Sequence, residues 1–230
     1  MVGENIMTRE EYLIIQKSSL FMGIEEQELE SMLKCLSAVR KKYQKGEFIL
    51  RFGDLVDSVG MVISGGANIL QEDCWGNRNI IAAADPGQTF AESYACMQGQ
   101  VLGVGVQAVQ TSDILFLNIR RILQNCSSSC QFHTRLIQNL LILVAGKNLQ
   151  LNEKLAHLSR RTTREKLFSY LSSEAIRQSG RIFEIPFNRQ QLADYLSVDR
   201  SAMSGELSKM RKEGILDFDR NRFTIKRGLS

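Results

Sequence analysis

Three absences in this 230-residue sequence narrow the classes of protein to be considered. No apolar run approaches the roughly 20 residues that span a bilayer, since the longest, residues 140–145, is far too short. The N-terminal residues lack the charged-then-apolar order of an export signal. The five cysteines are an odd count, which argues against a complete disulfide framework. We therefore expect a cytoplasmic protein with reduced cysteines and no membrane partner.

Histidine is also scarce, because the chain holds only His133 and His157, and both follow the region of short strands described below. Enzymes built on small β-barrels commonly gather two or more histidines and a carboxylate around a metal inside the barrel. No such set, no nucleophile paired with a base and no phosphate-binding glycine loop stands out. We expect neither an enzyme nor a metal site, and no resident cofactor.

Charge is divided unevenly along the chain. Residues 160–230 hold 15 Lys and Arg against 9 Asp and Glu, a net +6, whereas the whole chain carries only +4. Basic charge concentrated in one segment points to a phosphate-bearing partner such as nucleic acid. A basic surface that is merely solvated is the alternative.

Residues 188–210 have the pattern of two short helices joined by a tight turn. Asn188 can cap the first helix with Gln191 as its reciprocal partner, and Asp199 can cap the second. The inward faces are apolar at spacings of three and four: Leu192, Ala193, Tyr195 and Leu196, then Ala202, Met203, Leu207 and Met210. The outer face of the second helix is small and polar: Arg200, Ser201, Ser204, Gly205 and Ser208. Such a face suits a helix in the major groove of DNA, although an ordinary helical hairpin has the same pattern.

The sequence pattern changes near residue 38, from one typical of helices to one typical of short strands. Residues 1–36 are expected to be helical, with a break at Gly23. Short apolar runs separated by glycine turns then follow, at residues 48–50, 61–63, 69–70, 80–81 and 114–117. Many short strands at this spacing predict a sandwich or a small barrel.

A single long helix is predicted for residues 129–159. Spacings of four and three place six residues on one seam: Ile137, Leu141, Val144, Asn148, Leu151 and Leu155. An asparagine buried in such a seam favours two parallel helices in fixed register, because it pairs with its own copy. The alternative is a helix that packs on its own domain.

The last third of the chain has the parts of a winged-helix domain. After a hinge near residues 159–163, Thr162 and Glu165 form a capping box that opens a helix ending before Gly180. A strand at residues 182–185, the helix pair and a hairpin with a basic tip follow. The fold class is therefore α+β: an N-terminal double-stranded β-helix of jelly-roll type (1–128), a dimerisation helix (129–159) and a C-terminal winged helix-turn-helix domain (160–230).

This order of parts resembles the bacterial Crp–Fnr family of transcription regulators over nearly the whole chain. KGEFILRFGD (45–54), VISGGA (62–67) and DPGQTFAES (85–93) look like the family's cyclic-nucleotide-binding-type β-roll. FNRQQLADYLSVDRSAMSGELSKMRKEGIL (187–216) looks like its helix-turn-helix. The resemblance implies a homodimeric transcription factor that binds a palindromic operator in response to a small-molecule or redox signal. The partners implied are double-stranded DNA, a second copy of the chain, RNA polymerase and an unidentified small-molecule effector.

The resemblance also assigns roles in DNA binding. The residues expected to read base edges are Arg200, Ser201, Ser204 and Gly205. The residues expected near the phosphate track are Asn188, Arg189, Gln190, Ser208, Arg220 and Arg222. Family members commonly carry Glu and Arg where Ser201 and Gly205 stand here, so we expect a weakened or altered operator preference.

The expected effector pocket departs from the family's cyclic-nucleotide binders. Those proteins pair a Glu on the ribose hydroxyl with a downstream Arg-Ser or Arg-Thr on the cyclic phosphate. Glu92 and Ser93 stand at the first position, but Leu102 and Gly103 stand at the second, and no Arg occurs between Glu92 and Leu117. Burying a phosphate without a neutralising charge is costly, so we expect no tight binding of cAMP or cGMP. A purely structural role for Glu92 is the alternative to an effector contact.

Two hypotheses stay open from the sequence alone. Cys126 and Cys130 are four residues apart and would share a helical face, which suits a redox or metal sensor, whereas buried reduced thiols are the alternative. The iron–sulfur members of the family carry an N-terminal cysteine cluster that this chain lacks. The rival function is a ligand-binding regulatory protein whose rear domain docks a protein partner instead of DNA.

Overall fold

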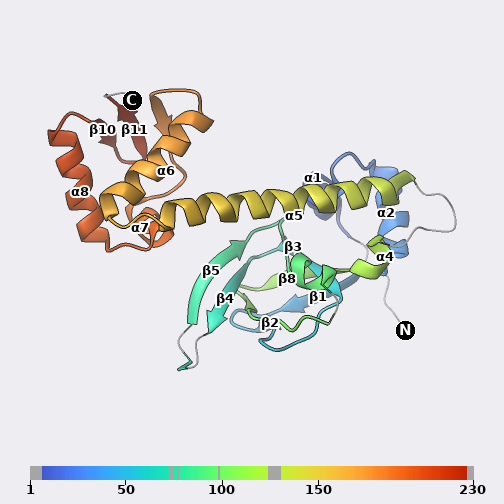
Figure 1. Cartoon of the computed structure of the whole chain (residues 1–230). Helices are drawn as coiled ribbons and strands as arrows, with labels where there is room; N and C mark the ends of the chain where they lie inside the picture. The colour runs from blue at the N-terminus through green and yellow to red at the C-terminus, as the bar shows by residue number, and fades with distance from the viewer. Residues whose placement is uncertain (1–6, 73–74, 77, 98, 124–130, 227–230) are drawn as a thin grey trace. The chain divides into compact units, whose positions relative to one another are not determined.

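The computed structural model describes residues 7–226, except for residues 73–74, 77, 98 and 124–130 (Figure 1). The chain divides into two compact units, Met1–Gly146 and Lys147–Ser230, and the division falls inside the long helix α5 (Gln131–Leu158). Each unit is described by itself. In the described part of the chain, no helix combines the length and the apolar character that crossing a membrane requires.

The first unit begins with two short helices, as the sequence predicts. Helices α1 (Arg9–Lys17) and α2 (Glu26–Cys35) are separated by a single 3₁₀ turn, η1 (Ser19–Phe21). The break expected at Gly23 is confirmed, because its φ of +75° is one that glycine adopts without steric cost. Thr8 and Glu11 form a capping box that begins α1.

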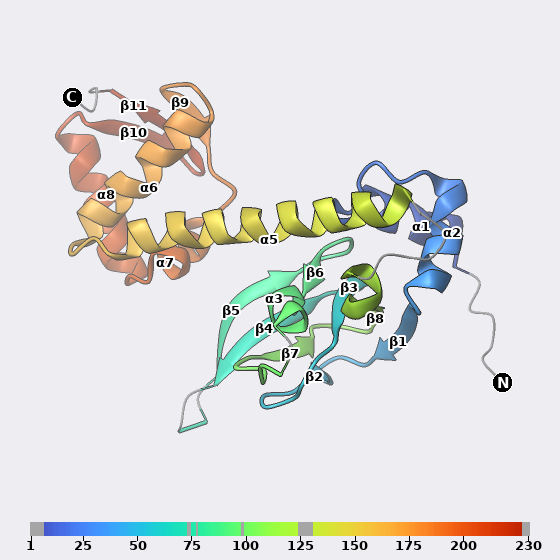
Figure 2. The same cartoon turned by 45° about the vertical axis from the view of Figure 1, so that its right-hand side comes forward.

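Among the described residues of this unit, eight antiparallel strands form two four-stranded sheets, which confirms the predicted sandwich (Figures 1 and 2). The first sheet has the order β1-β8-β3-β6, and its strands are Val39–Tyr43, Ser112–Asn118, Ser58–Ser64 and Thr89–Phe90. The second has the order β2-β7-β4-β5, with strands Phe48–Leu50, Gly105–Ala108, Ala67–Glu72 and Arg78–Ala84. Two short helices, α3 (Glu92–Cys96) and α4 (Ile119–Leu123), complete the unit.

The central strand β3 is buried on both faces. Val62 packs with residues of both sheets in the interior of the sandwich, among them Ala84, Val106 and Ile114. Met61, one residue earlier on β3, belongs to a second cluster that also contains the apolar side chains of α1, η1 and α2. Successive residues of a strand point to opposite faces, so the N-terminal helices cover the outer face of the first sheet.

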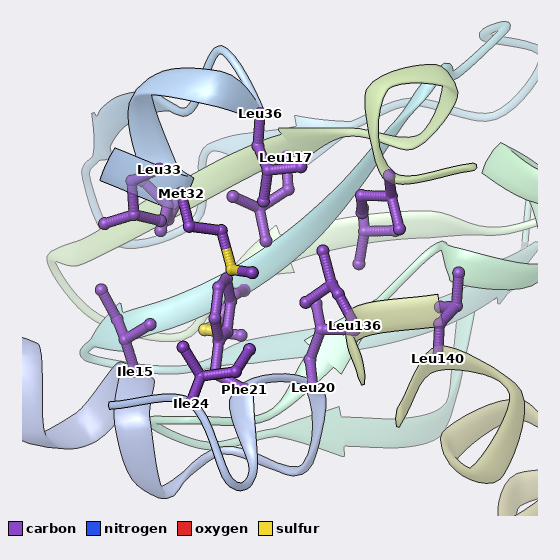
Figure 3. Close-up of a cluster of buried hydrophobic side chains, with 14 of the residues drawn as sticks. Ile15, Leu20, Phe21, Ile24, Met32, Leu33, Leu36, Leu117, Leu136 and Leu140 are labelled. Carbon is purple, nitrogen blue, oxygen red and sulfur yellow. The ribbon is translucent and has the colours of Figure 1, made fainter. Parts of the chain in front are cut away.

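The first half of α5 belongs to that second cluster. Leu136 and Leu140 of α5 lie with Leu20 and Phe21 in the buried group of Figure 3. Asn139, which is 7% exposed, donates its amide hydrogens to the carbonyl oxygens of Leu20 at 3.0 Å and Met22 at 2.9 Å. Hydrophobic contact, one buried hydrogen bond and one partly buried hydrogen bond thus fix this half of the helix to η1 and the loop after it.

The described residues of the second unit form the second half of α5, three further helices and a small sheet, which confirms the winged helix-turn-helix fold. Its helices after α5 are α6 (Thr163–Arg177), α7 (Arg189–Leu196) and α8 (Arg200–Lys212). The sheet has the order β10-β11-β9, with strands Leu216–Asp219, Arg222–Ile225 and Ile182–Glu184. All neighbouring strands are antiparallel, and one core cluster joins helices and sheet.

The capping residues predicted for the starts of these helices are confirmed. Thr162 and Glu165 form the capping box of α6, and Asn188 and Gln191 form that of α7. Asp199 accepts a hydrogen bond from the backbone N–H of Ala202 at 2.8 Å and so caps α8.

One predicted inward position on α8 is wrong. Met203, Leu207 and Met210 are fully buried, but Ala202 is exposed. Successive helix positions are rotated by about 100°, so Ala202 turns away from a stripe centred on the other three residues. Tyr195 on α7 is only partly buried, whereas Leu192, Ala193 and Leu196 are buried as expected.

Candidate nucleic-acid interface

The outer face of α8 presents the residues that the sequence assigns to base reading. Arg200, Ser201 and Gly205 are exposed, and Ser204 is partly exposed. Ser201 Oγ donates to Asp199 Oδ1, so this hydroxyl proton is already used within the cap of the helix. A Cβ on Gly205 would meet nothing within 4 Å, so the surface there is open. Among these four residues, Arg200 is the long side chain that can donate hydrogen bonds to a base. A face that is otherwise small and polar suits insertion into a major groove.

Two cations of α6 hold the helix-turn-helix in place. Lys166 Nζ donates to the carbonyl oxygens of Leu196 at 3.1 Å and Ser197 at 3.4 Å, which are the last carbonyls before the turn. The guanidinium of Arg164 pairs with two carboxylates of the α8 region, Glu206 at 3.1 Å and Glu213. The orientation of α8 against α6 is therefore fixed by ionic contacts as well as by the apolar core.

The residues expected near the phosphate track at the start of α7 already have intramolecular partners. Asn188 Oδ1 accepts from the N–H of Gln191 at 2.9 Å, and Gln190 Nε2 donates to Asp194 Oδ1 at 2.8 Å. The guanidinium of Arg189 lies over the rings of Phe218, at 4.6 Å, and Phe223, at 5.1 Å. Burial lowers the pKa of this guanidinium below its usual value. Arg189 thus joins α7 to the wing through cation–π contacts, a role that the sequence did not indicate.

Ser208 Oγ on α8 donates to the carbonyl oxygen of Ser204 at 2.9 Å. The residue is exposed and its hydroxyl proton is already used, so it offers an acceptor on this face more readily than a donor.

The hairpin of β10 and β11 forms the wing. Asp219 and Arg222 are its last paired residues, and Arg220 at the tip has a φ of +51°. Asn221 connects the tip to the segment between β9 and α7, because its Nδ2 donates to the carbonyl oxygen of Ile185 at 3.2 Å. Arg220 and Arg222 are both exposed, as the sequence predicted for a basic tip.

Ion pairing leaves particular cations of this unit without a carboxylate. Arg211 and Lys226 pair with Asp217, at 2.8 and 2.9 Å. None of the ion pairs formed by the described residues involves Arg200, Arg220 or Arg222. The positive charge that remains unneutralised therefore includes the leading residue of α8 and the tip of the wing, where contact with phosphate or bases needs it.

A buried histidine that the sequence did not single out joins three helices. His157, in the last turn of α5, is 2% exposed. Its Nδ1 lies 2.8 Å from the hydroxyl oxygen of Ser169 on α6. Its ring packs edge-on against Tyr170 of α6, at 5.7 Å between centroids, and lies 6.4 Å from Tyr195 of α7. His157 therefore connects the end of α5 to the domain that carries α8.

We expect the stability of the second unit to fall on acidification through about pH 6.5. Burial lowers the pKa of His157 from its usual 6.5, and the carboxylates of Glu153 and Glu174 offset this only in part. The unfolded chain then takes up a proton more readily than the folded chain, so stability is complete above pH 6.5 and falls towards the lowered pKa. Urea unfolding at pH 7.5, 6.5 and 5.5 measures the effect. His157→Phe, which keeps a ring but cannot titrate, should show a smaller loss, and equal losses in the two proteins would contradict this assignment.

The residues of the expected effector pocket are divided between interior and surface. Glu92 and Leu102 are buried at 3% and 2% exposure, whereas Ser93 and Gly103 are exposed. A Cβ on Gly103 would lie 3.3 Å from the hydroxyl oxygen of Tyr94, so α3 lies beside the segment of residues 102–103. The negative charge of Glu92 contributes, after burial, to raising the pKa of the Cys96 thiol.

The described residues cover only part of the cysteine and metal chemistry that the sequence suggests. Cys126 and Cys130 lie outside the described residues, so the hypothesis of a sensor there stays a prediction. Among the residues that are described, no three or more His, Cys, Asp or Glu side chains form a group that could hold a metal ion.

The predicted seam residues of α5 divide into two sets. Leu141, Asn148, Leu151 and Leu155 are exposed, with 68%, 61% and 61% for the three leucines. Ile137 and Val144 are partly buried against the core cluster of the first unit instead. Ile142 and Leu149, which the seam pattern did not include, are 69% and 71% exposed. We call Leu141, Ile142, Leu149, Leu151 and Leu155 the α5 stripe.

Comparisons with known proteins agree with both halves of this description. Residues 40–129 match the model of the cyclic nucleotide-binding domain, and residues 165–227 match that of the Crp-like helix-turn-helix domain. The transcriptional activator protein FnrL of Cereibacter sphaeroides is 25% identical over 194 residues, covering 80% of this chain and 75% of FnrL. The cyclic AMP receptor protein of Thermus thermophilus is 24% identical over 200 residues, covering 86% and 88% of the two chains.

Among solved structures, the c-di-GMP responsive global regulator CLP of Xanthomonas campestris has the same fold. The TM-score is 0.56 at 16% identity, and the match covers 89% of this chain and 100% of CLP.

A winged helix-turn-helix joined by a long helix to a cyclic-nucleotide-binding-type β-roll defines a DNA-binding transcription regulator. The chain belongs to the Crp/Fnr family.

Proposed function

We propose that this regulator acts as a homodimer held along α5, and that it binds a palindromic operator with one α8 in the major groove of each half-site. An effector bound to the first unit changes how well the two α8 helices fit their half-sites. The protein has no catalytic step of its own, and as a regulator of bacterial genes it works beside the chromosome, in the cytoplasm. RNA polymerase is the further partner that a transcription regulator of this kind would contact.

The α5 stripe carries the dimer proposal. Five large apolar side chains, each 61–71% exposed, lie along 15 residues of one helix. Leu141, Leu151 and Leu155 share the side of α5 that the seam pattern predicts, and exposed apolar side chains on one side of a long helix mark a surface that a second copy of the helix can cover. Asn152 Nδ2 donates to Asn148 Oδ1 at 2.8 Å, so a polar pair interrupts the stripe. Such a polar position favours one register between two parallel helices.

The unneutralised cations support the DNA-binding mode. A dimer would present Arg200, Arg220 and Arg222 twice, related by a two-fold axis, so that the symmetry of the protein matches that of a palindrome. Half-sites about 34 Å, or one turn of DNA, apart are expected for helix-turn-helix dimers.

The effector is proposed to be something other than cAMP. Relatives with this fold are named for different ligands, cyclic AMP for one and c-di-GMP for another, so the fold does not fix the effector. Glu92 is buried here, and no Arg stands near Leu102 and Gly103 in the sequence to neutralise a phosphate.

We expect calorimetric titration with cAMP to give no binding heat at concentrations up to about 100 μM, because a buried phosphate would lack a counter-charge. The Thermus thermophilus cyclic AMP receptor protein, titrated under the same conditions, serves as the positive control. A micromolar dissociation constant for this chain would contradict the prediction.

Selection of genomic fragments followed by a salt series tests the proposal as a whole. The protein should recover fragments that share a palindrome, and the logarithm of its affinity should fall linearly with the logarithm of the salt concentration. A duplex carrying a single half-site should bind much more weakly than the palindrome. Equal affinity for both duplexes would contradict binding as a dimer.

A further inference from the structure

A cysteine and a histidine 98 residues apart in the sequence meet inside the first unit. Cys35 is the last residue of α2 and is partly exposed, and its sulfur is a thiol, not half of a disulfide. His133 lies in the first turn of α5 and is only 4% exposed. The Sγ of Cys35 lies 3.9 Å from the Nε2 of His133. The tautomer of His133 decides which of the two atoms donates in this contact.

His133 is not explained by a structural role. Its Nδ1 is buried and has no hydrogen-bond partner among the described residues, although buried polar atoms of a purely structural side chain are nearly always satisfied. The nitrogen that does have a contact is the one that faces the thiol. This buried, half-satisfied imidazole thus points at a sulfur that solvent can reach.

One cation contacts the backbone at Cys35. The guanidinium of Arg121 on α4 donates to the backbone carbonyl oxygen of Cys35 at 3.3 Å. The neighbouring Lys34 pairs with Glu30 at 2.8 Å, on the exposed side of α2. Reactive cysteines are found in partly exposed places with a histidine or another cation nearby.

We propose that Cys35 and His133 form a thiolate–imidazolium pair that makes Cys35 a peroxide-reactive thiol. The thiol proton moves to His133, and the thiolate attacks one oxygen of the peroxide. An S–O bond forms as the O–O bond breaks, and the leaving hydroxide takes the proton back from His133 to become water. Cys35 is oxidised to a sulfenic acid and one peroxide molecule is reduced.

The oxidised product would alter a contact that positions α5. Cys35 ends α2 and His133 begins α5, so added oxygen on the sulfur falls between these two helices. The inference names the chemistry of a redox signal for the proposed regulator, but it rests on the first unit alone, so it can fail while the dimer proposal stands.

Cys96 in the same unit provides an internal control. It is also a thiol and is partly exposed, but burial and the negative charge of Glu92 raise its pKa. It has no histidine contact among the described residues. Its thiol should therefore stay protonated and react slowly at neutral pH.

Alkylation of the full-length protein by iodoacetamide between pH 5.5 and 9.5, with labelling of each cysteine followed by peptide mass spectrometry, tests the pair. The labelling rate of Cys35 should have its midpoint at least about one pH unit below the 8.5 of an ordinary thiol, and Cys96 should have its midpoint above 8.5. His133→Gln should slow labelling of Cys35 at pH 7 about tenfold and leave Cys96 unchanged.

A second measurement on the unmodified sequence keeps the inference testable if His133→Gln does not fold. After exposure to hydrogen peroxide, a sulfenic-acid trap should label Cys35 about tenfold faster than Cys96. A Cys35 midpoint at or above 8.5, or trapping confined to the other cysteines, would overturn the proposal.

Discussion

Replacing Leu151 and Leu155 together by aspartate is expected to lower the affinity for a palindromic operator by about a hundredfold or more. Both side chains are 61% exposed, so neither contributes to the core of a single chain. In the proposed dimer each would lose about 1.5–3 kcal/mol of apolar burial, and every 1.4 kcal/mol is a factor of ten. The four carboxylates of the dimer would also repel one another. Fluorescence anisotropy with a labelled operator measures the change.

Ile176→Asp is the matched control for this experiment. Ile176 lies on α6 and is 78% exposed, so the substitution places a carboxylate on the same unit away from α5, one per chain against two in the double variant. Its affinity for the operator should change less than about threefold, since surface substitutions away from a contact usually have small effects. A double variant that binds as tightly as the Ile176→Asp control would show that the α5 stripe does not hold the dimer.

Gly205→Arg is expected to tighten binding to a palindrome with guanine at the facing base by about tenfold. The position is exposed and a Cβ there meets nothing within 4 Å, so an arginine can be accommodated. A bidentate contact between arginine and guanine contributes about 1–3 kcal/mol of discrimination. Dissociation constants for duplexes with guanine and with adenine at that position give the measurement.

Gly205→Ala separates the new contact from a change in the helix. Alanine removes the cost of about 1 kcal/mol that glycine imposes on a helix interior, but it cannot reach a base edge. It should raise thermal stability and leave the preference between the two duplexes unchanged. If arginine gave no gain over alanine on the guanine duplex, Gly205 would not face the groove.

Much of the second unit could be predicted because its signals are local. A side-chain cap and its partner lie three residues apart, so Asn188 with Gln191 and Thr162 with Glu165 are visible in the sequence. Ala202 was assigned wrongly because an alanine beside an apolar stripe is compatible with either face of the helix. The partners of Arg189 in the wing, Phe218 and Phe223, are 29 and 34 residues away, and no local pattern reveals them.

In the first unit, parts of the two sheets were harder to predict from the sequence. Strand β1 has the sequence VRKKY, which lacks the apolar alternation of a half-buried strand. What holds it is non-local: the guanidinium of Arg40 pairs with Glu11 of α1 and, at 3.1 Å, with Asp113 of β8. Gly105 in β7 is needed because a Cβ would come within 2.7 Å of the ring of Phe52. Contacts of this kind appear only once the chain has folded.

The predicted seam shows what periodicity leaves undetermined. Its spacing places six residues on one side of α5, but spacing does not say which part of that side the helix's own domain covers. Ile137 and Val144 are partly buried against the core of the first unit, whereas Ile142 and Leu149 are exposed on another side of the helix. The contacts of His157 with Ser169 and of Cys35 with His133 were beyond sequence reasoning for the same reason, since each joins different helices.

The stoichiometry of the complex with DNA tests the central claim most directly. Native mass spectrometry of the 26.0 kDa chain, alone and with a duplex carrying the selected palindrome, counts the copies in each species. Dimerisation along α5 predicts two chains without DNA and two chains on each duplex. A single chain in both states, at concentrations where the operator is bound, would contradict it.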